Sequence, residues 1–421
     1  MVTASESPPF MSLSNRQAEV TLAVLLGLAV LVPLVRSVLP VGYWLWAVIA
    51  ALSVVAATLV VVVRPRVSSP QLLGISLIMA FVVALTASSM INGVLERVDA
   101  LRLGVLVVAF SLGTVLRTPG AFRAFVLVVV GGGLLFSVAV IGVTVAGVGI
   151  EVLQERDGYL ATGLRQAMAL AGASGILVAV AVFGGRSRRT IMLVLLCVVA
   201  TVGLAFNHGR GAMLWGVVAS IVVIVIGLTA GLTQGGRSVR LTRARRAVWI
   251  WLALPVLPVT VTWLAMLDPR SEGRIRRVLQ NPLEAESRFS IWERSIDAII
   301  QAPWMGGGVG SYRDIHSTYA HNVFLHAAED GGILATWLLM ILVVSALVGA
   351  VVRIWRRPEW WGYGLLGILL VVTLSAQTST SLYDWIALFV PLGLTWGYLA
   401  KTTSGSAGYL FKPAVGPDRT I

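Results

Sequence analysis

Apolar runs of about 20 residues recur along most of the chain, and this is the length that a helix needs to cross the hydrocarbon core of a bilayer. Only 12% of the 421 residues are charged, whereas soluble domains carry about 25%. Too few charged residues remain to cover a large soluble core, so we expect an all-α, polytopic transmembrane helical bundle with about 12 spans. The apolar runs lie near residues 20–39, 41–63, 71–91, 100–116, 122–149, 162–183, 190–206, 211–231, 248–267, 331–352, 361–376 and 382–400.

The net charge of +13 is spread unevenly over the connections between these runs. With both termini on one side of the membrane, that side carries 19 of the 32 basic residues but only four of the 19 acidic ones. Basic residues accumulate on the cytoplasmic side, so we expect both termini in the cytoplasm. The excess of basic residues is then explained by the orientation of the chain in the membrane and by attraction to anionic lipid. We therefore expect no nucleic-acid partner. The polar start lacks a charged n-region, and no small-residue cleavage site follows, so no removable signal peptide is expected.

The longest connection lies on the outer face, and long loops in compact proteins are usually functional. A second long connection, 233–247, is basic and cytoplasmic, and it is either a plain topology signal or a regulatory or lipid-binding loop. The predicted segments are a cytoplasmic N-terminal tail (1–19), spans one to nine (20–267), a long extracytoplasmic loop (268–330), spans ten to twelve (331–400) and a cytoplasmic C-terminal tail (401–421).

The outer loop contains an amphipathic segment, "ESRFSIWERSIDAIIQAP". Phe289, Trp292, Ile296 and Ile299 recur at helical spacing on one face, and Pro303 ends the segment. We expect a helix that lies on the outer leaflet or caps the bundle. The glycine-rich stretch that follows is either a flexible turn or a loop whose backbone N–H groups bind phosphate.

Ionisable residues are nearly absent from the apolar runs and gather at their outer ends. A charge near the midplane costs about 2.5–3.5 kcal/mol on insertion scales, yet a proton-coupled transporter normally has some there, so their scarcity argues against that class. His208 and Arg210 lie in a short hairpin, where Arg210 either binds an anion or snorkels to the interface. Arg288 lies one turn from Trp292 and is either an anion ligand or a solvated interfacial arginine.

A third cluster, "STYAHNVFLHAAEDGG" (317–332), leads directly into an apolar run. If the helix begins near the tyrosine of this stretch, Asn322, His326 and Glu329 share one stripe and His321 lies on a neighbouring one. His321 and Asn322 are then at or near a helix N-terminus, where backbone N–H groups and the helix dipole favour anions. A neutral histidine can also take a proton from an attacking hydroxyl. The alternative is an interfacial polar cap without chemistry.

Taken together, these residues resemble the signature region of the O-antigen ligase and O-antigen polymerase superfamily. The shared pattern is an arginine, a tryptophan one turn later, a Pro-x-x-Gly-x-Gly turn, a His-Asn pair, an apolar pair and a Glu-x-Gly that enters a span. The matching residues here are Arg288, Trp292, Pro303, Gly306, Gly308, His321, Asn322, Phe324, Leu325, Glu329 and Gly331. Upstream, Arg210 matches the arginine of an outer hairpin with Gly209 in place of the usual serine, and Gln166 is the nearest match to an asparagine-containing stretch.

The resemblance implies a membrane glycosyltransferase that acts on the outer face of the cytoplasmic membrane in surface-polysaccharide biosynthesis. Its donor would be a polyprenyl-diphosphate-linked oligosaccharide, and its acceptor a glycan or glycolipid. The resemblance implies His321, Asn322 and Glu329 as catalytic residues and Arg210 and Arg288 as ligands of the diphosphate. The chain has no Asp-x-Asp motif and a single cysteine, so we expect neither a metal nor a cofactor. Possible supporting residues are His208, Gln166, Trp292, Gly306 and Gly308.

Three alternatives remain open. Within the class, the enzyme is either a ligase, which moves a finished glycan to a different acceptor, or a polymerase, which extends a lipid-linked chain. Outside the class, the chain is a flippase for lipid-linked oligosaccharides or another polytopic transporter, which we would expect to show internal repeats or polar residues at the midplane. The third alternative, a non-catalytic membrane scaffold, would not need His321 and Asn322 beside paired arginines.

Overall fold

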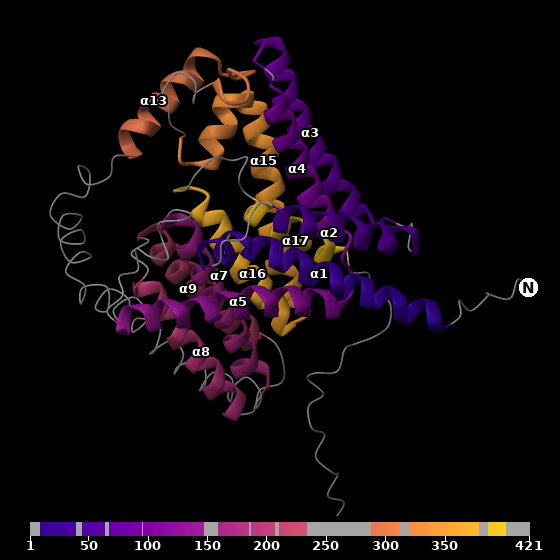
Figure 1. The fold of residues 1–421 in the computed structure, drawn as a ribbon, viewed down its shortest axis with the longest axis vertical. Coiled ribbons are helices and arrows are strands. Elements are labelled where there is room, and N and C mark those ends of the chain that lie inside the picture. Colours follow the sequence, from indigo (N-terminus) through magenta and orange to yellow (C-terminus); the bar gives the residue numbers. More distant parts are fainter. Residues whose placement is uncertain are drawn as a thin grey trace, which may run out of the picture.

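The computed structural model describes ten stretches of the chain, and within these stretches every element is a helix (Figure 1). The described residues are 9–38, 44–63, 67–94, 96–146, 159–184, 187–206, 210–233, 288–311, 320–378 and 386–400. The helices are α1 (Pro9–Val38), α2 (Trp44–Val63), α3 (Ser69–Ile91), α4 (Arg97–Thr114), α5 (Pro119–Val145), α7 (Tyr159–Ala179) with a π-helical turn η1 (Val180–Gly184), α8 (Ser187–Phe206), α9 (Arg210–Thr233), α13 (Arg288–Gln301), α15 (Val323–Arg356), α16 (Trp360–Ser375) and α17 (Ile386–Leu399).

The predicted all-α membrane character is confirmed by the length and apolarity of these helices. Among the described residues, 5 helices are long and apolar enough to cross a bilayer: Ser69–Ile91, Pro119–Val145, Leu164–Phe183, Gly211–Thr233 and Val323–Arg356. Shorter apolar helices cover Thr190–Phe206, Trp360–Ser375 and Ile386–Leu399. Each predicted apolar run coincides with a described helix except 248–267, which lies outside the described residues. The count of about 12 spans therefore stays a prediction.

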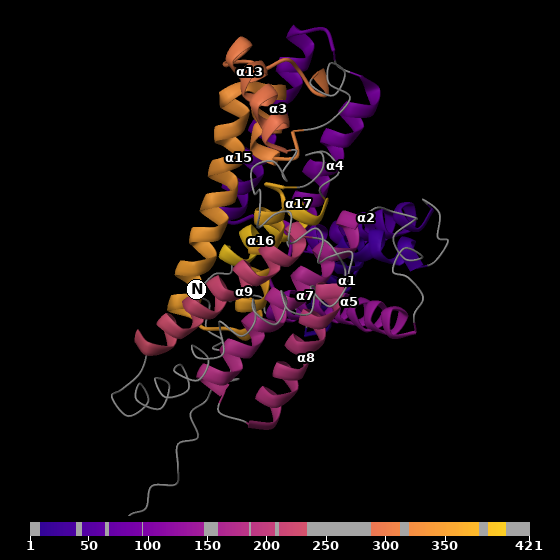
Figure 2. The same cartoon turned by 90° about the vertical axis from the view of Figure 1, so that its left-hand side faces the viewer.

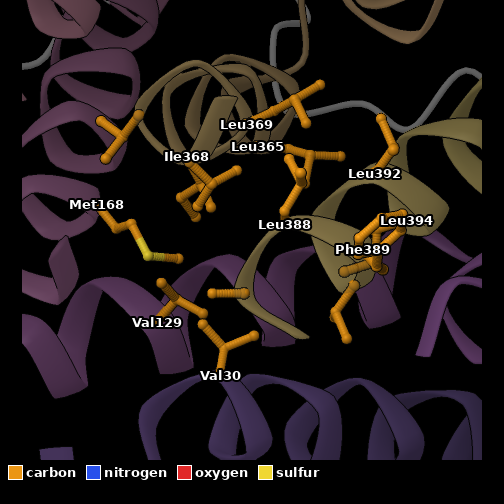
Figure 3. Close-up of a cluster of buried hydrophobic side chains, with 14 of the residues drawn as sticks. Val30, Val129, Met168, Leu365, Ile368, Leu369, Leu388, Phe389, Leu392 and Leu394 are labelled. Atoms are coloured by element: carbon orange, nitrogen blue, oxygen red, sulfur yellow. The ribbon is translucent and has the colours of Figure 1, made fainter. Parts of the chain in front are cut away.

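The helices run in more than one direction. α3 and α15 pack side by side and run steeply, whereas α1 and α5 pair with each other and cross that direction (Figures 1 and 2). The hydrophobic core lies where several of these elements meet. Figure 3 shows Val30 of α1, Val129 of α5, Met168 of α7, Ile368 of α16 and Phe389 of α17 directed into it.

A close helix contact fixes the place of α16. α7 and α16 pack against each other, and a Cβ atom added at Gly367 would lie 2.7 Å from the carbonyl carbon of Ala171. Only a glycine lets the two backbones approach this closely, as in other membrane helix pairs. The contact holds α16 so that the residue after its C-terminal end, Ala376, lies beside the start of α15.

The first helix begins earlier than its apolar run suggests. α1 starts at Pro9, inside the segment expected to be a polar tail. Glu19 is fully buried in α1, and its carboxylate accepts hydrogen bonds from the backbone N–H groups of Arg117 at 3.0 Å and Thr118 at 2.7 Å. These N–H groups precede α5, so the acid binds α1 to the N-terminal end of α5, where the helix dipole favours a negative charge.

Within the predicted outer loop, α13 covers the expected amphipathic segment, but only one side of it packs inward. Ser295 is fully buried on the side that faces α15. Phe289 and Ile296, which we expected on the packed face, are 46% and 49% exposed. The reason is that α13 lies at the edge of the molecule, where its main packing partner among the described helices is α15. Exposed apolar side chains on such a helix suit contact with lipid.

Candidate functional site

The site is built around a break in α15. Gly332 has φ 69 and ψ −169, which divides the helix into a first part (residues 323–331) and a second part (residues 333–356). In a continuous helix the carbonyl groups of Glu329 and Asp330 would accept hydrogen bonds from residues four positions later. Because the break removes these donors, both carbonyl groups need other partners.

The glycine-rich loop after α13 supplies those partners. Gly307 N donates to Glu329 O at 2.7 Å and Gly308 N donates to Asp330 O at 3.0 Å. A Cβ atom at Gly306, where φ is 67, would lie 2.6 Å from Glu329 O, so the loop can lie against α15 only as glycine. We call residues 303–311 the glycine strap.

The strap uses its own N–H groups within the protein. Gly306 N donates to Ala302 O, Val309 N to Ser89 Oγ and Gly310 N to Asp330 Oδ1 at 3.3 Å, in addition to the two bonds above. Every N–H group from Gly306 to Gly310 therefore has a protein acceptor. Of the two interpretations of this stretch, these contacts favour a turn, and the supporting roles of Gly306 and Gly308 in a substrate site stay predictions.

The C-terminal end of α3 holds the other side of the strap. Ser88 Oγ donates to Asp330 O at 2.6 Å, Ser89 Oγ accepts from Val309 N at 2.8 Å, and Asn92 Nδ2 donates to Gly306 O at 3.1 Å. None of these three residues was among the predicted site residues. Their one local signal is a group of polar side chains at the end of an apolar run.

His326 and Asp330 form a buried pair in the first part of α15. His326 Nε2 lies 3.2 Å from Asp330 Oδ2, and their side chains are 3% and 0% exposed. Within the predicted stripe of Asn322, His326 and Glu329, the side chain of His326 is directed to Asp330. Asp330 was not among the predicted site residues, although it accepts from three different parts of the fold.

Asn322 is the N-cap of α15. Its side-chain oxygen accepts hydrogen bonds from Phe324 N at 3.0 Å and Leu325 N at 3.2 Å. The helix consequently begins at Val323, so His321 lies just before it and not on a helical stripe, as it would if the helix began near Tyr319. An asparagine before the first turn satisfies the N–H groups that have no helical partner, and the sequence could have indicated this end.

His321 directly precedes this cap in a strained backbone conformation. Its φ of 51 is the one left-handed value at a non-glycine position among the described residues. Such a conformation costs about 1–3 kcal/mol and occurs often at functional sites. His321 is half-buried and lies at the N-terminal end of α15, as the sequence predicted.

A short turn after α16 links this end of α15 to α9. Val323 N donates to Ala376 O at 2.9 Å, and Trp215 Nε1 of α9 donates to Thr378 Oγ1 at 2.8 Å. A Cβ atom at Gly211 would lie 3.2 Å from the same Thr378 oxygen. The first turn of α9 therefore lies in the neighbourhood of the start of α15.

This first turn contains the predicted Arg210. Arg210 is the first residue of α9, while its side chain and all of His208 lie outside the described residues. Gln166 is fully buried in α7, and its neighbour Ala167 lies 3.0 Å from a Cβ atom added at Gly216 of α9. Gln166 is thus in the part of α7 that packs against α9. The contact point on α9, Gly216, is less than two helical turns from Arg210.

The seam between α13 and the first part of α15 contains the remaining predicted residues. Arg288 begins α13, and its side chain lies outside the described residues. Trp292 packs edge-to-face against Phe289, with ring centroids 5.6 Å apart, and its buried indole N–H has no acceptor among the described residues. Glu329 is 4% exposed, and neither carboxyl oxygen accepts a hydrogen bond from the described residues. Ser295 lies beside this carboxyl, but its hydroxyl proton goes to Ile291 O at 3.0 Å.

No group of three or more His, Cys, Asp and Glu side chains in the described stretches could hold a metal ion. Independence from metal stays a prediction. No model of a known protein family matches the sequence, and no curated protein matches it. The resemblance to the O-antigen ligase and polymerase superfamily therefore depends on the motif residues themselves.

Proposed function

We propose that this protein is a glycosyltransferase of the cytoplasmic membrane that transfers or polymerises a glycan from a polyprenyl-diphosphate-linked donor on the outer face. The observation that supports it best is the setting of His321. This histidine has a strained backbone and lies at the N-terminal end of α15. The first residue of that helix, Val323, is linked through the turn at 376–378 to the helix that Arg210 begins.

The proposed reaction is a displacement at the anomeric carbon of the donor. An acceptor hydroxyl forms the new bond to that carbon as its proton passes to His321. The bond between the anomeric carbon and the diphosphate oxygen breaks, and the polyprenyl diphosphate leaves with the bonding electrons. Arg210 and Arg288 bind the diphosphate before and during this step, because guanidinium groups match phosphate oxygens in paired hydrogen bonds.

The role proposed for Asn322 is to position the site. Its side-chain oxygen caps α15 and so fixes the direction of the N–H groups and the dipole beside His321. The proposed topology has about 12 spans, cytoplasmic termini and residues 268–330 outside, and its support is the excess of basic residues on one side. No described feature favours a flippase or a scaffold over this function.

The test uses the purified full-length chain in lipid nanodiscs with a polyprenyl-diphosphate oligosaccharide and a glycolipid acceptor. Release of polyprenyl diphosphate together with a lengthened acceptor is the expected result. A longer lipid-linked product without transfer to the acceptor would identify a polymerase, and a ligase gives the opposite product. Parallel reactions with a strong chelator test the expected independence from metal. The proposal fails if neither product nor free polyprenyl diphosphate appears.

A further inference from the structure

We infer that Glu329 and Trp292 form a subsite for a hydroxyl group of a carbohydrate, in the seam between α13 and the first part of α15. The inference rests on the proposed function for the choice of a glycan, and it adds the group that would bind a sugar ring of the substrate. Its basis is a pair of buried polar groups, the carboxyl group of Glu329 and the indole N–H of Trp292. Neither forms a hydrogen bond with the residues that the structure describes.

The acceptor is the carboxyl group of Glu329. It is 4% exposed, and both of its oxygens lack a donor among the described residues. Burying a polar group without a hydrogen bond costs about 1–3 kcal/mol, so an unpartnered buried carboxyl calls for an explanation such as a bound ligand. Ser295 lies close enough to interact with this carboxyl, but in the structure its hydroxyl donates to Ile291 O at 3.0 Å and not to Glu329.

The surrounding hydrogen bonds keep this carboxyl in the seam. Glu329 O is bound to Gly307 N, so the backbone at this position cannot rotate freely. The neighbouring Asp330 does have donors, because its carboxylate lies 3.2 Å from His326 Nε2 and accepts a hydrogen bond from Gly310 N. Among the described residues, the Asp330 carboxylate therefore has a hydrogen-bond donor, whereas neither Glu329 carboxyl oxygen accepts a hydrogen bond.

The donor is the indole N–H of Trp292. Trp292 and Ser295 are three positions apart on α13 and so share the helix face that packs toward α15. The indole N–H is buried without an acceptor, while the side chain as a whole is half-buried. The seam consequently reaches the protein surface at this tryptophan, which gives a ligand a way in.

A sugar hydroxyl satisfies both groups at once. A hydroxyl donates one hydrogen bond and accepts others, so it can donate to Glu329 and accept from the Trp292 N–H. A bare cation would bind the carboxylate but would be repelled by the indole N–H. An anion could accept from the indole N–H but would be repelled by the carboxylate. The tryptophan ring also offers an apolar surface to the C–H groups of a sugar ring.

The test measures sugar binding without requiring transfer. The full-length protein in nanodiscs is mixed with the methyl glycosides of glucose, galactose, mannose and N-acetylglucosamine, and binding is followed by saturation-transfer NMR. At least one glycoside should bind, about 10-fold more weakly to Glu329→Gln and about 3-fold more weakly to Trp292→Phe. The matched controls are Glu293→Gln, an exposed acid on α13, and Trp304→Phe, a 74% exposed tryptophan in the strap. Both controls should bind as the wild type does.

The outcomes separate this subsite from the proposed function. The subsite is disproved if no glycoside binds, or if both site variants bind as tightly as their controls. Trp292→Phe removes only the N–H and part of the ring, so it keeps the test valid if Glu329→Gln fails to fold. Glycoside binding that depends on both residues, without any release of polyprenyl diphosphate, would support the subsite and refute the glycosyltransferase. If Glu329→Gln and Trp292→Phe both transfer glycan at the wild-type rate, the glycosyltransferase is supported and the subsite is refuted.

Discussion

His326 Nε2 lies 3.2 Å from Asp330 Oδ2 in the first part of α15, where both side chains are buried, and the same aspartate accepts a hydrogen bond from Gly310 N. Asp330 therefore connects the helix to the glycine strap. We expect Asp330→Ala to lower the free energy of unfolding by about 3 kcal/mol, because removing one member of a buried pair leaves its partners unsatisfied. Thermal unfolding in detergent measures this. Asp297→Ala, an exposed acid on α13, should change stability by less than about 0.5 kcal/mol, and equal effects of the two substitutions would contradict the connecting role.

Gly332 allows the break in α15, and its substitution should be costly. A Cβ atom there would lie 2.7 Å from Met305 N and would occupy φ 69, which side chains other than glycine rarely adopt. Gly332→Ala should destabilise the protein by at least about 2 kcal/mol. Gly104→Ala in α4 is the control, since nothing lies within 4 Å of its added Cβ and alanine favours helix by about 0.5–1 kcal/mol. The break is not a requirement of the fold if Gly332→Ala melts at the temperature of the wild type.

The sequence predicts most helices because their signal is local. Runs of apolar residues give the positions of the described helices, and the spacing of Phe289 and Trp292 gives α13. Even there, the apolar spacing does not say which side packs: the face with Ser295 is buried and Phe289 is exposed. Burial depends on which neighbour a helix meets, and that information is not contained in the helix itself.

The candidate site is less predictable because its contacts are distant in sequence. Ser88 and the carbonyl group of Asp330 are 242 residues apart, and no periodic pattern links them. Nothing in the local sequence distinguishes Asp330 from other acids, because its hydrogen bonds come from Gly308 and Gly310 of the glycine strap. In contrast, Asn322 is a residue type preferred at helix N-caps, so the start of α15 at Val323 is predictable from the local sequence.

His321 should be separable from His326 by kinetics. As the proposed general base, His321→Ala should lower turnover by roughly 10²–10⁴-fold while the donor lipid still binds. His326→Ala should instead reduce stability, because it removes one of the partners of the buried Asp330 carboxylate. Steady-state transfer and donor binding are measured for both variants at a temperature where both are folded. If His326→Ala is folded but inactive and His321→Ala is fully active, the base has been assigned to the wrong histidine.

Arg288 is expected to act on the donor before and during the reaction. Arg288→Ala should weaken both donor binding and turnover, since a diphosphate contact is present in the ground state and in the transition state. Arg288→Lys should restore only part of the loss, because an ammonium group keeps the charge without the two-pronged geometry. Arg294 is a suitable control: it lies on the same helix, is exposed, and its Nε donates to Ser290 O at 3.2 Å. Equal losses for Arg288→Ala and Arg294→Ala would indicate a general effect of charge on this helix.

The predicted topology places residues 268–330 outside and the basic loop 233–247 in the cytoplasm, because the excess of basic residues lies on the side of the termini. Replacing the single cysteine, Cys197, by alanine provides a background free of thiols. In intact cells, a membrane-impermeant maleimide should label Ser271→Cys and leave Ser238→Cys unlabelled until the cells are opened. Labelling of Ser238→Cys from outside would invert the proposed orientation and would put Arg288 and His321 on the cytoplasmic side, where the proposed outer-face reaction could not use them.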